Sequence, residues 1–277
     1  MNTSASKGPS DKALADTFGL VDIPEAEKLS KVQLYFKDLG PQVGWATVFY
    51  VEYALPPVVY ALFWLLRQDW MVPYTSLCPW IAAYFPPITD HVGLRALAAA
   101  CYVGHFVKRE LETAFVHRFS HATMPLTNIF KNCSYYWLFA LFIAYFTNHH
   151  LYTFPSFGMP QVYLGLGIFL FGELGNLSCH LALRNLRPPG STVRRIPQPL
   201  AWSPFTYLFH LVACPNYTYE VVSWIGFTIM TQTLAAGLFT LFGFGQMAIW
   251  SLNKLRAYKK DFCDFPKTRK AIVPFFL

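Results

Sequence analysis

The stretch GNLSCHLALRNLRPPGSTVRRIPQP, residues 175–199, decides the fold, because it joins the end of a long apolar segment to a loop with four arginines. The segment that leads into it, VYLGLGIFLFGELGNLSCHLAL, has the length of about 20 mostly apolar residues that a helix needs to cross a bilayer. Arginines directly after such a segment are typical of the cytosolic end of a transmembrane helix. The stretch therefore predicts a membrane-spanning helix that ends in a basic cytosolic loop.

The composition of the 277 residues extends this prediction to the whole chain. Hydrophobic residues make up 54% and charged residues only 13%, which is too apolar and too poor in charge for a soluble domain. We expect an all-α integral membrane protein, a bundle of about six transmembrane helices. The apolar stretches that predict them lie near residues 44–66, 92–113, 132–148, 161–183, 219–235 and 237–253. The apolar segment 203–213 is too short to span, which predicts an interfacial or partly inserted piece.

The net charge of +7 is distributed unevenly. Basic residues gather before the first predicted span, between the second and third, after the fourth and after the last, whereas the other loops hold almost none. By the positive-inside rule, both termini and the basic loops face the cytosol. The N-terminal residues lack the pattern of a cleavable signal peptide, so the first span is expected to insert by itself. The expected environment is a bilayer, with no nucleic acid partner.

Composition divides the chain into three parts. Residues 1–31 are polar and mixed in charge, which predicts a mobile tail. Residues 32–43 begin with VQLYF, which alternates like a single strand, and continue as a linker. Residues 44–277 form the membrane domain. The six cysteines are scattered without a CxxC pair, so we expect neither a disulfide framework nor a metal site.

One predicted helix carries five polar residues in register. Glu173, Asn176, His180, Arg184 and Arg187 follow one another at spacings of 3, 4, 4 and 3, which places them on one face. Ionisable groups inside a span are costly and by default mark a functional site. The stripe predicts a polar ligand cavity, although interhelical hydrogen bonds would also explain such residues.

The arginine loop after this stripe is suited to phosphate. Planar guanidinium groups bind phosphate through two parallel hydrogen bonds, whereas lipid headgroups attract basic residues without demanding a geometry. The turn residues of RPPGS are suited to hold the arginines in place. We therefore expect a phosphate-rich soluble ligand that enters from the cytosol. Because the sequence lacks the glycine fingerprint of Rossmann sites, the membrane bundle itself would bind any nucleotide.

The second predicted span also carries polar residues on one face. His105, Glu112 and either Lys108 or Arg109 lie three or four residues apart, so their side chains are neighbours on a helix. The alternative for Lys108 is a side chain that extends toward the lipid headgroups.

The first predicted span contains a glutamate close to two prolines. Glu52 needs a partner or a proton inside a membrane, and its alternative role is to hold two helices together. Pro56 and Pro57 are predicted to break the helix, which would leave backbone groups for neighbours or water.

The start of the fifth predicted span, CPNYTYE, holds Asn216, Tyr217, Tyr219 and Glu220. Helix capping explains Asn216 by itself, and the interfacial preference of tyrosine explains one of the two tyrosines. A glutamate and a second tyrosine are left, which favours a functional role for this segment.

Four segments together resemble one family. LETAFVHRFSHATMPL, GNLSCHLALRNLRPPGSTVRRIPQP, CPNYTYEVVSWIGF and DFPKTRKAIVPFFL are similar to the very-long-chain trans-2-enoyl-CoA reductases, a group within the steroid 5-alpha-reductase family, and the likeness runs from about residue 33 to the end. The resemblance implies a multi-pass enzyme of the endoplasmic reticulum that uses NADPH to reduce long-chain trans-2-enoyl-CoA in fatty-acid elongation and in sphingolipid metabolism. It also implies elongase and 3-hydroxyacyl-CoA dehydratase subunits as partners.

The resemblance implies a set of site residues. Those that match cofactor-binding positions are Asn176, His180, Arg184, Arg187, Arg195, Asn216, Glu220, Trp224 and Tyr258. Those that it implies for catalysis are Tyr217, Lys108 and Glu52. The arginines would hold the phosphates of NADPH, including the 2'-phosphate. Tyr217, assisted by the charge of Lys108, would serve the thioester oxygen or supply the proton, and Glu52 would orient the nicotinamide amide or the lysine.

Four positions depart from the steroid reductases. Val51 stands where they have a glutamine and Phe106 where they have a catalytic tyrosine. His180 stands where they have an aspartate, and Arg194 where they have a tyrosine. Because Phe106 cannot donate a proton, a steroid-type reaction is disfavoured. The enoyl reductases commonly begin with a ubiquitin-like domain, of which only the last strand is similar here, in VQLYFKDLG.

Two other functions fit part of the sequence. A catalytically weakened relative would keep the bundle and bind NADPH or elongation partners without turnover. A di-iron lipid desaturase would need many clustered histidines. Here His117 and His121 are predicted on one side of the membrane, and His149 and His150 on the other.

Overall fold

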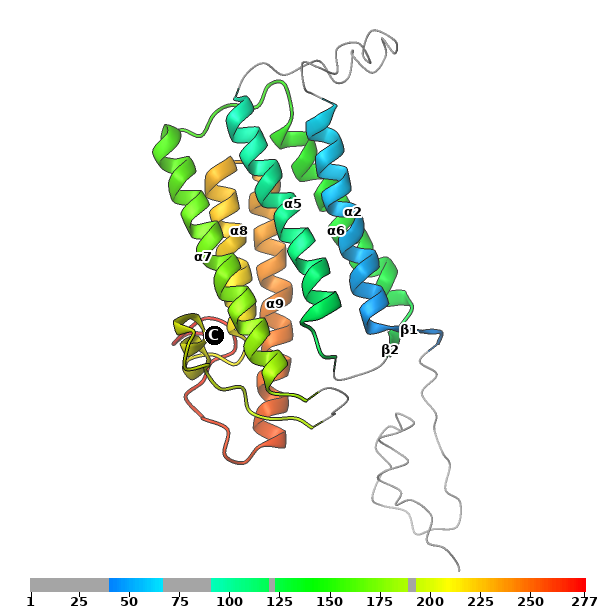
Figure 1. Cartoon of the computed structure of the whole chain (residues 1–277), viewed down its shortest axis with the longest axis vertical. Coiled ribbons are helices and arrows are strands. Elements are labelled where there is room, and N and C mark those ends of the chain that lie inside the picture. Colours follow the sequence, from blue (N-terminus) through cyan, green and yellow to red (C-terminus); the bar gives the residue numbers. More distant parts are fainter. Residues whose placement is uncertain (1–39, 67–90, 120–122, 189–192) are drawn as a thin grey trace, which may run out of the picture.

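The computed structural model describes residues 40–66, 91–119, 123–188 and 193–277. These residues form six long helices, α2 (Trp45–Leu65), α5 (Val92–Phe115), α6 (Thr127–Thr147), α7 (Gly158–Asn185), α8 (Pro215–Thr231) and α9 (Leu234–Asp261). The helices lie side by side along the long axis of the molecule (Figure 1). The prediction of an all-α bundle of about six helices is confirmed. The predicted tail at residues 1–31 and the strand at 32–36 lie outside the described residues.

The helices differ in how apolar they are. By length and composition alone, α2, α7 and α9 are long and apolar enough to cross a membrane. The other three carry polar residues, of which Glu112 on α5 contacts α7 and Asn132 on α6 contacts α2. The six helices have 17–28 residues, which at about 1.5 Å per residue is close to or above the ~30 Å of a bilayer's hydrocarbon core. The segment 203–213 contains only η2 (Pro204–His210), a short 3-10 helix, as its length predicted.

Helix α2 runs without interruption through Pro56 and Pro57, so the predicted break is wrong. Proline has no N–H, and the carbonyl oxygens of Glu52 and Tyr53, four residues earlier, therefore receive no intrahelical bond from these positions. Neighbouring helices stabilise such a site in a membrane bundle, and both α5 and α6 pack against α2. Tertiary packing thus outweighs the local preference of the proline pair.

Most arginine and lysine side chains of the described residues gather at one end of the bundle, which we call the basic end, whereas Arg95 lies near the other end. It holds Arg118, Lys131, Arg187 and Lys254, because α5, α7 and α9 end there and α6 begins there. His149 and His150 follow the other end of α6, so they lie far from His117, as the sequence predicted. His121 lies outside the described residues. This separation argues against a shared di-iron centre.

Two short connections order the basic end. Strand β1 (Gln42–Gly44) pairs antiparallel with β2 (Thr123–Pro125), which ties the start of α2 to the start of α6. The C-terminal tail returns to the bundle, where the amide of Lys270 donates to the Leu211 carbonyl at 2.8 Å. Buried Arg269 donates to the Pro197 carbonyl at 2.8 Å. The tail therefore holds the end of the arginine loop (Figure 1).

Glycines bring α7 and α8 into backbone contact. A Cβ atom at Gly165 would lie 2.5 Å from the backbone nitrogen of Met230, and one at Gly226 would lie 2.3 Å from that of Phe169. Small residues allow this approach in membranes, where dispersion contacts between helices drive association. The α7–α8 pair is thus fixed tightly.

We expect Gly165→Val to destabilise the bundle, because its side chain would meet the Met230 backbone. Overpacking of this kind costs about 1–3 kcal/mol, so the Tm of the detergent-purified protein should fall. Gly167→Val on the same helix is the matched control, since nothing lies within 4 Å of a Cβ there. Equal Tm values for the two variants would contradict the close packing of α7 on α8.

Candidate active site

A cavity of about 910 Å³ lies within the bundle toward the basic end. Its wall is largely aromatic, with Tyr53, Tyr136 and Trp224 among the lining residues. Seven of the predicted site residues line it: Glu52, His180, Arg184, Asn216, Tyr217, Glu220 and Trp224. They come from α2, α7 and α8, so folding brings together residues from three separate sequence motifs.

A second cavity of about 270 Å³ adjoins the first. Arg187, Arg195 and Tyr258 line it, with three further cations from Arg118, Arg194 and Lys254. Tyr217 and Asn216 line both cavities. Tyr217 therefore lies where an aromatic chamber meets a strongly basic one.

The basic chamber is held by contacts among its own residues. The guanidinium group of Arg118 donates to the backbone carbonyls of Arg184 and Arg187, which fixes the turn at the end of α7. Arg194 pairs with Asp261 at the end of α9. The ring of Tyr258 stacks on Phe265, at 5.4 Å between centroids.

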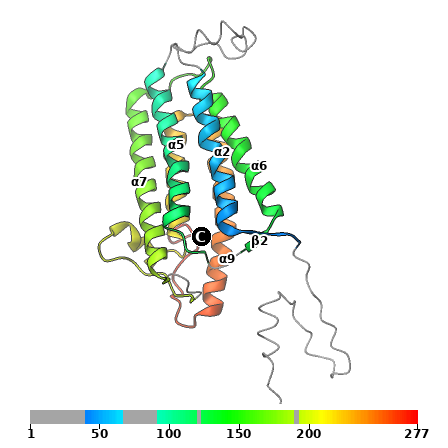
Figure 2. The same ribbon diagram turned by 45° about the vertical axis from the view of Figure 1, so that its right-hand side comes forward.

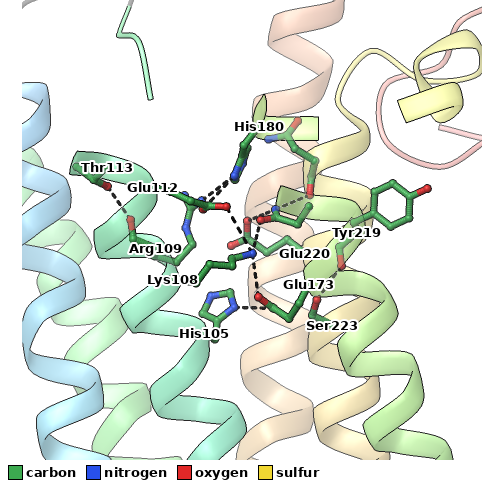
Figure 3. A network of polar contacts seen from close by, with 12 residues as sticks. His105, Lys108, Arg109, Glu112, Thr113, Glu173, His180, Tyr219, Glu220 and Ser223 are labelled. Atoms are coloured by element: carbon green, nitrogen blue, oxygen red, sulfur yellow. Dashed lines mark hydrogen bonds and ion pairs between the residues drawn. The ribbon is translucent and has the colours of Figure 1, made fainter. Parts of the chain in front are cut away.

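Lys108 lies behind the cavity wall, in a buried network between α5 and α7 (Figure 3). Its ammonium group lies 2.8 Å from Glu173 Oε2, and His105 Nδ1 lies 2.8 Å from the other oxygen of that carboxylate. Lys108 also donates to Asn176 Oδ1 at 2.7 Å. The alternative in which Lys108 extends to the lipid headgroups is therefore wrong, since carboxylate and amide partners hold it inside the bundle.

Asn176 connects this network to the wall. Its side-chain amide donates to the Asn216 carbonyl at 3.0 Å and to Glu220 Oε2 at 3.4 Å. Neither Lys108 nor Asn176 is among the residues that line the two cavities. Lys108 is thus connected to the cavity wall through Asn176 and Asn216. A direct effect of its positive charge on Tyr217 stays a prediction.

A second charged cluster lies nearer the basic end. Arg109 Nη1 lies 2.6 Å from Glu112 Oε2, and His180 Nδ1 lies 3.0 Å from the same oxygen. Figure 3 shows Arg109, Glu112 and His180 converging between α5 and α7. Arg109 Nη2 also donates to the Tyr53 hydroxyl at 3.3 Å. The guanidinium group thus joins the cluster to the aromatic wall.

His117 packs edge-on against His180, with 4.8 Å between ring centroids. Burial, followed by the positive charge of Arg109, lowers the pKa of His117 to about 3. The imidazole is therefore neutral at physiological pH.

Glu112, His117 and His180 are the residue types that bind transition metals, and their ligand atoms lie within 4.8 Å of one another. Arg109 already supplies a positive charge to Glu112 at hydrogen-bond distance. A metal ion would have to displace this guanidinium group, so the observed arrangement favours an ion pair over a metal centre.

The polar stripe on α7 makes interhelical hydrogen bonds and also lines the cavity, which are the two alternatives that the sequence left open. Glu173 and Asn176 make hydrogen bonds to α5 and α8. One and two turns later, His180 and Arg184 line the cavity. The half of the stripe away from the basic end is structural, and the half near it forms the site.

Glu52 is 2% exposed and lines the cavity, where it accepts a hydrogen bond of 2.8 Å from the amide of Asn132 on α6. The hydrogen bond from Asn132 differs from the two partners that the resemblance implied for Glu52, the nicotinamide amide or the lysine. Phe106 packs beside Tyr53 and Trp224 with no exposed surface.

Sequence reasoning did not select Tyr53, Asn132 or Tyr136 for the wall. Asn132 and Tyr136 are one helical turn apart, and this was the available signal. Their surroundings, KNCSYYWLF, are apolar and aromatic, which is also the pattern of residues at a membrane interface.

Comparison with known proteins gives a consistent family. The family model of the 3-oxo-5-alpha-steroid 4-dehydrogenases matches residues 122–277. A probable very-long-chain enoyl-CoA reductase of Caenorhabditis elegans is 50% identical over 97% of this chain and 83% of the relative. The very-long-chain enoyl-CoA reductase of Dictyostelium discoideum is 49% identical over 88% of this chain and 74% of its own. A mouse trans-2,3-enoyl-CoA reductase-like protein is 42% identical over 90% and 65%.

We expect Lys108→Met to destabilise the protein by about 3 kcal/mol, because it leaves the Glu173 carboxylate buried with one cation fewer. The double variant Lys108→Met/Glu173→Gln removes the uncompensated charge and should recover part of this loss. Tm values in detergent for both single variants and the double variant would measure the coupling. Strictly additive losses would contradict the ion pair.

Proposed function

Since the chain belongs to the steroid 5-alpha-reductase family and, within it, to the very-long-chain enoyl-CoA reductases, we infer that it is an oxidoreductase that acts on enoyl-CoA. We propose that it uses NADPH to reduce long- and very-long-chain trans-2-enoyl-CoA to saturated acyl-CoA. The observation that carries this proposal is the position of Tyr217, which lines both the aromatic cavity and the basic one. A reductase needs a phosphate-binding region and an apolar region that meet at a group able to donate a proton.

The basic cavity fits NADPH by the chemistry of its donors. Arg187 and Arg195 present guanidinium groups, which match phosphate oxygens bidentately. We assign the 2'-phosphate and the pyrophosphate to this chamber. We assign the nicotinamide end to the wall near Asn216, Glu220 and Trp224. When bound, NADPH supplies the hydride.

Tyr217 is the group that we assign to the substrate. Reduction of the double bond puts negative charge on the thioester oxygen and requires a proton at the alpha carbon. The Tyr217 hydroxyl would donate to that oxygen or supply the proton. Lys108 is a positioning residue in this scheme, since it holds Asn176, whose amide holds the carbonyl of Asn216, the neighbour of Tyr217.

Glu52 is assigned to the nicotinamide amide. A carboxylate in the cavity wall accepts the N–H groups of an amide, and Asn132 keeps one of its oxygens in place.

A specific observation disfavours a steroid-type reaction. Phe106 is fully buried among aromatic rings and carries no donor, although it corresponds to the catalytic tyrosine of steroid reductases. A flexible acyl chain fits a mainly apolar wall without such a donor. A weakened relative that only binds NADPH would also keep this cavity, and turnover decides between the two.

The cellular setting follows from the proposed reaction. We infer a location in the endoplasmic reticulum membrane with both termini and the basic end in the cytosol, where CoA and NADPH are available. Saturated acyl-CoA would be the final product of each elongation cycle, so the supplier of the substrate is a dehydratase of 3-hydroxyacyl-CoA. Sphingosine-derived chains are a second substrate source.

The direct test is NADPH oxidation by the detergent-purified protein with a long-chain trans-2-enoyl-CoA. NADH and a 3-oxo-4-ene steroid serve as parallel controls. Formation of saturated acyl-CoA with NADPH supports the proposal. Binding of NADPH without product would instead support the weakened relative.

We predict that Tyr217→Phe lowers kcat by at least about 100-fold, the contribution of a positioned proton donor. The change leaves the arginines of the basic cavity in place, so the Kd of NADPH should stay the same. Stopped-flow turnover and NADPH fluorescence titration would measure the two quantities. Retained turnover would remove Tyr217 from the mechanism.

We predict that Arg195→Gln weakens NADPH binding by about 10-fold, since a hydrogen bond to a charged group contributes about 1.5–3 kcal/mol. The affinity for NADH should change less if the arginine holds the 2'-phosphate. Arg256→Gln is the matched control, because Arg256 is exposed on α9 and does not line the basic cavity. Equal losses in both variants would point to general charge attraction instead.

A further inference from the structure

Helices α6 and α9 form one wall of the aromatic cavity over almost the same depth. The lining residues of α6 follow the helical repeat of three and four residues and so share one face. They are Asn128, Lys131, Asn132, Tyr135, Tyr136 and Phe139. Those of α9 run from Phe239 to Trp250. At about 1.5 Å per residue, each face follows the cavity for roughly 16 Å.

The two helices touch mainly at the inner end of this wall. The rings of Tyr135 and Phe239 stack at 5.4 Å, and the Tyr135 hydroxyl donates to the Phe239 carbonyl at 3.2 Å. Phe139 packs against Phe239 and Phe242 at 5.3 and 6.1 Å. The rings of Tyr135, Phe139 and Phe239 form the floor of the cavity, and Phe242 lies at its edge. Toward the basic end α6 leans away from α9 (Figure 2).

The exposure of the lining residues indicates an opening in the side of the bundle. A cavity open only at the basic end would have lining residues that become more buried with depth. Phe242 lies about 12 Å further along α9 than Trp250, at 1.5 Å per residue. It is nevertheless 57% exposed, whereas Trp250 is 43% exposed. Phe242 therefore lines the cavity and also faces the outside of the bundle.

The outer surface at this level is suited to lipid. Leu138 on α6 and Leu241 on α9 are 64% and 62% exposed, and both are fully apolar side chains. In a bilayer these positions face hydrocarbon, so an opening between them leads into the acyl-chain region of the membrane and not into water.

The depth of the cavity limits what it can hold. Its length of roughly 16 Å is close to the thickness of one leaflet, half of the ~30 Å hydrocarbon core. The same space must also take the thioester and the nicotinamide end of the cofactor. An acyl chain as long as those of the membrane lipids therefore does not fit straight between the basic end and the aromatic floor.

We propose that the seam between α6 and α9, beside Phe242 and Gly243, is a lateral portal through which the distal part of a long acyl chain passes from the cavity into the bilayer. The proposal rests on the proposed enoyl-CoA reduction, which it deepens by naming the route of the chain. The chain stays in an apolar environment throughout, so its exit carries no hydrophobic penalty. Chain length beyond the portal is then limited only by the membrane.

Gly243 lies at the seam, where α9 faces the Tyr135 side chain of α6. A Cβ atom at this position would lie 3.2 Å from the Tyr135 hydroxyl and 3.8 Å from Met247 Cε. A larger side chain would fill the space between α9 and α6. The part of the cavity toward the basic end, which Arg184 and Tyr217 line, would stay open.

The test compares Gly243→Leu with Gly245→Leu. Gly245 is exposed on the same helix and does not line the cavity, and a Cβ atom at this position would have nothing within 4 Å. Leucine favours helix over glycine at both positions, so neither change weakens α9 by propensity. Reduction of trans-2-hexenoyl-CoA and trans-2-icosenoyl-CoA would be measured for each variant, together with the Kd of the saturated hexanoyl-CoA and icosanoyl-CoA.

Gly243→Leu should lower the ratio of kcat/KM for the long substrate over the short one by about 10-fold or more, as expected for a blocked apolar subsite. The ratio of the two saturated-ligand affinities should fall in the same direction, and Gly245→Leu should change neither ratio. Unchanged ratios in Gly243→Leu, or equal changes in both variants, would overturn the portal. If Gly243→Leu lowered the ratio of icosanoyl-CoA to hexanoyl-CoA affinity but the wild-type protein formed no product, the portal would stand and the proposed reduction would fail.

Discussion

Two buried carboxylates of the bundle are paired with cations, and these ion pairs organise the protein. Glu173 on α7 is held by Lys108 and His105 of α5, and Glu112 on α5 is held by Arg109 and by His180 of α7. Breaking either group would leave an uncompensated charge in a low-dielectric interior. The two clusters therefore fix the rotation of α5 against α7, and with it the side chains that α7 presents to the cavity.

Rigidity is distributed unevenly around the cavity, in a way that matches the proposed chemistry. Glycines bring α7 and α8 into backbone contact, and Arg269 of the tail secures the arginine loop beside them. The side that would hold the cofactor is thus preorganised, as binding of a charged dinucleotide requires. On the opposite side α6 and α9 meet mainly through aromatic rings at the floor. An apolar chain needs little geometric precision, so the looser wall suits it.

The proposed reaction would explain how one fold serves different enones. A steroid is rigid and can be held between fixed donors, whereas a thioester on a long chain brings its own CoA headgroup to the basic end. Phe106 is a buried apolar ring, while Tyr217 lies at the junction of the two cavities. Under the proposed assignment, the difference in substrate would follow from a few side chains on a shared helical bundle.

The sequence by itself determined the helices, their number, the basic end and the polar face of α7, because apolar run length, charge position and helical period are local properties. It also placed most of the candidate site residues, since the arginines and Tyr217 stand next to helix ends. Only the tertiary structure decided which polar residues line the cavity and which pair behind it. Lys108 and Asn176 meet across 68 residues of sequence, and Glu52 and Asn132 across 80. The tertiary structure also decided that α2 continues through Pro56 and Pro57, because neighbouring helices pack against it there. Such contacts depend on how helices rotate against one another, and no local pattern encodes that rotation.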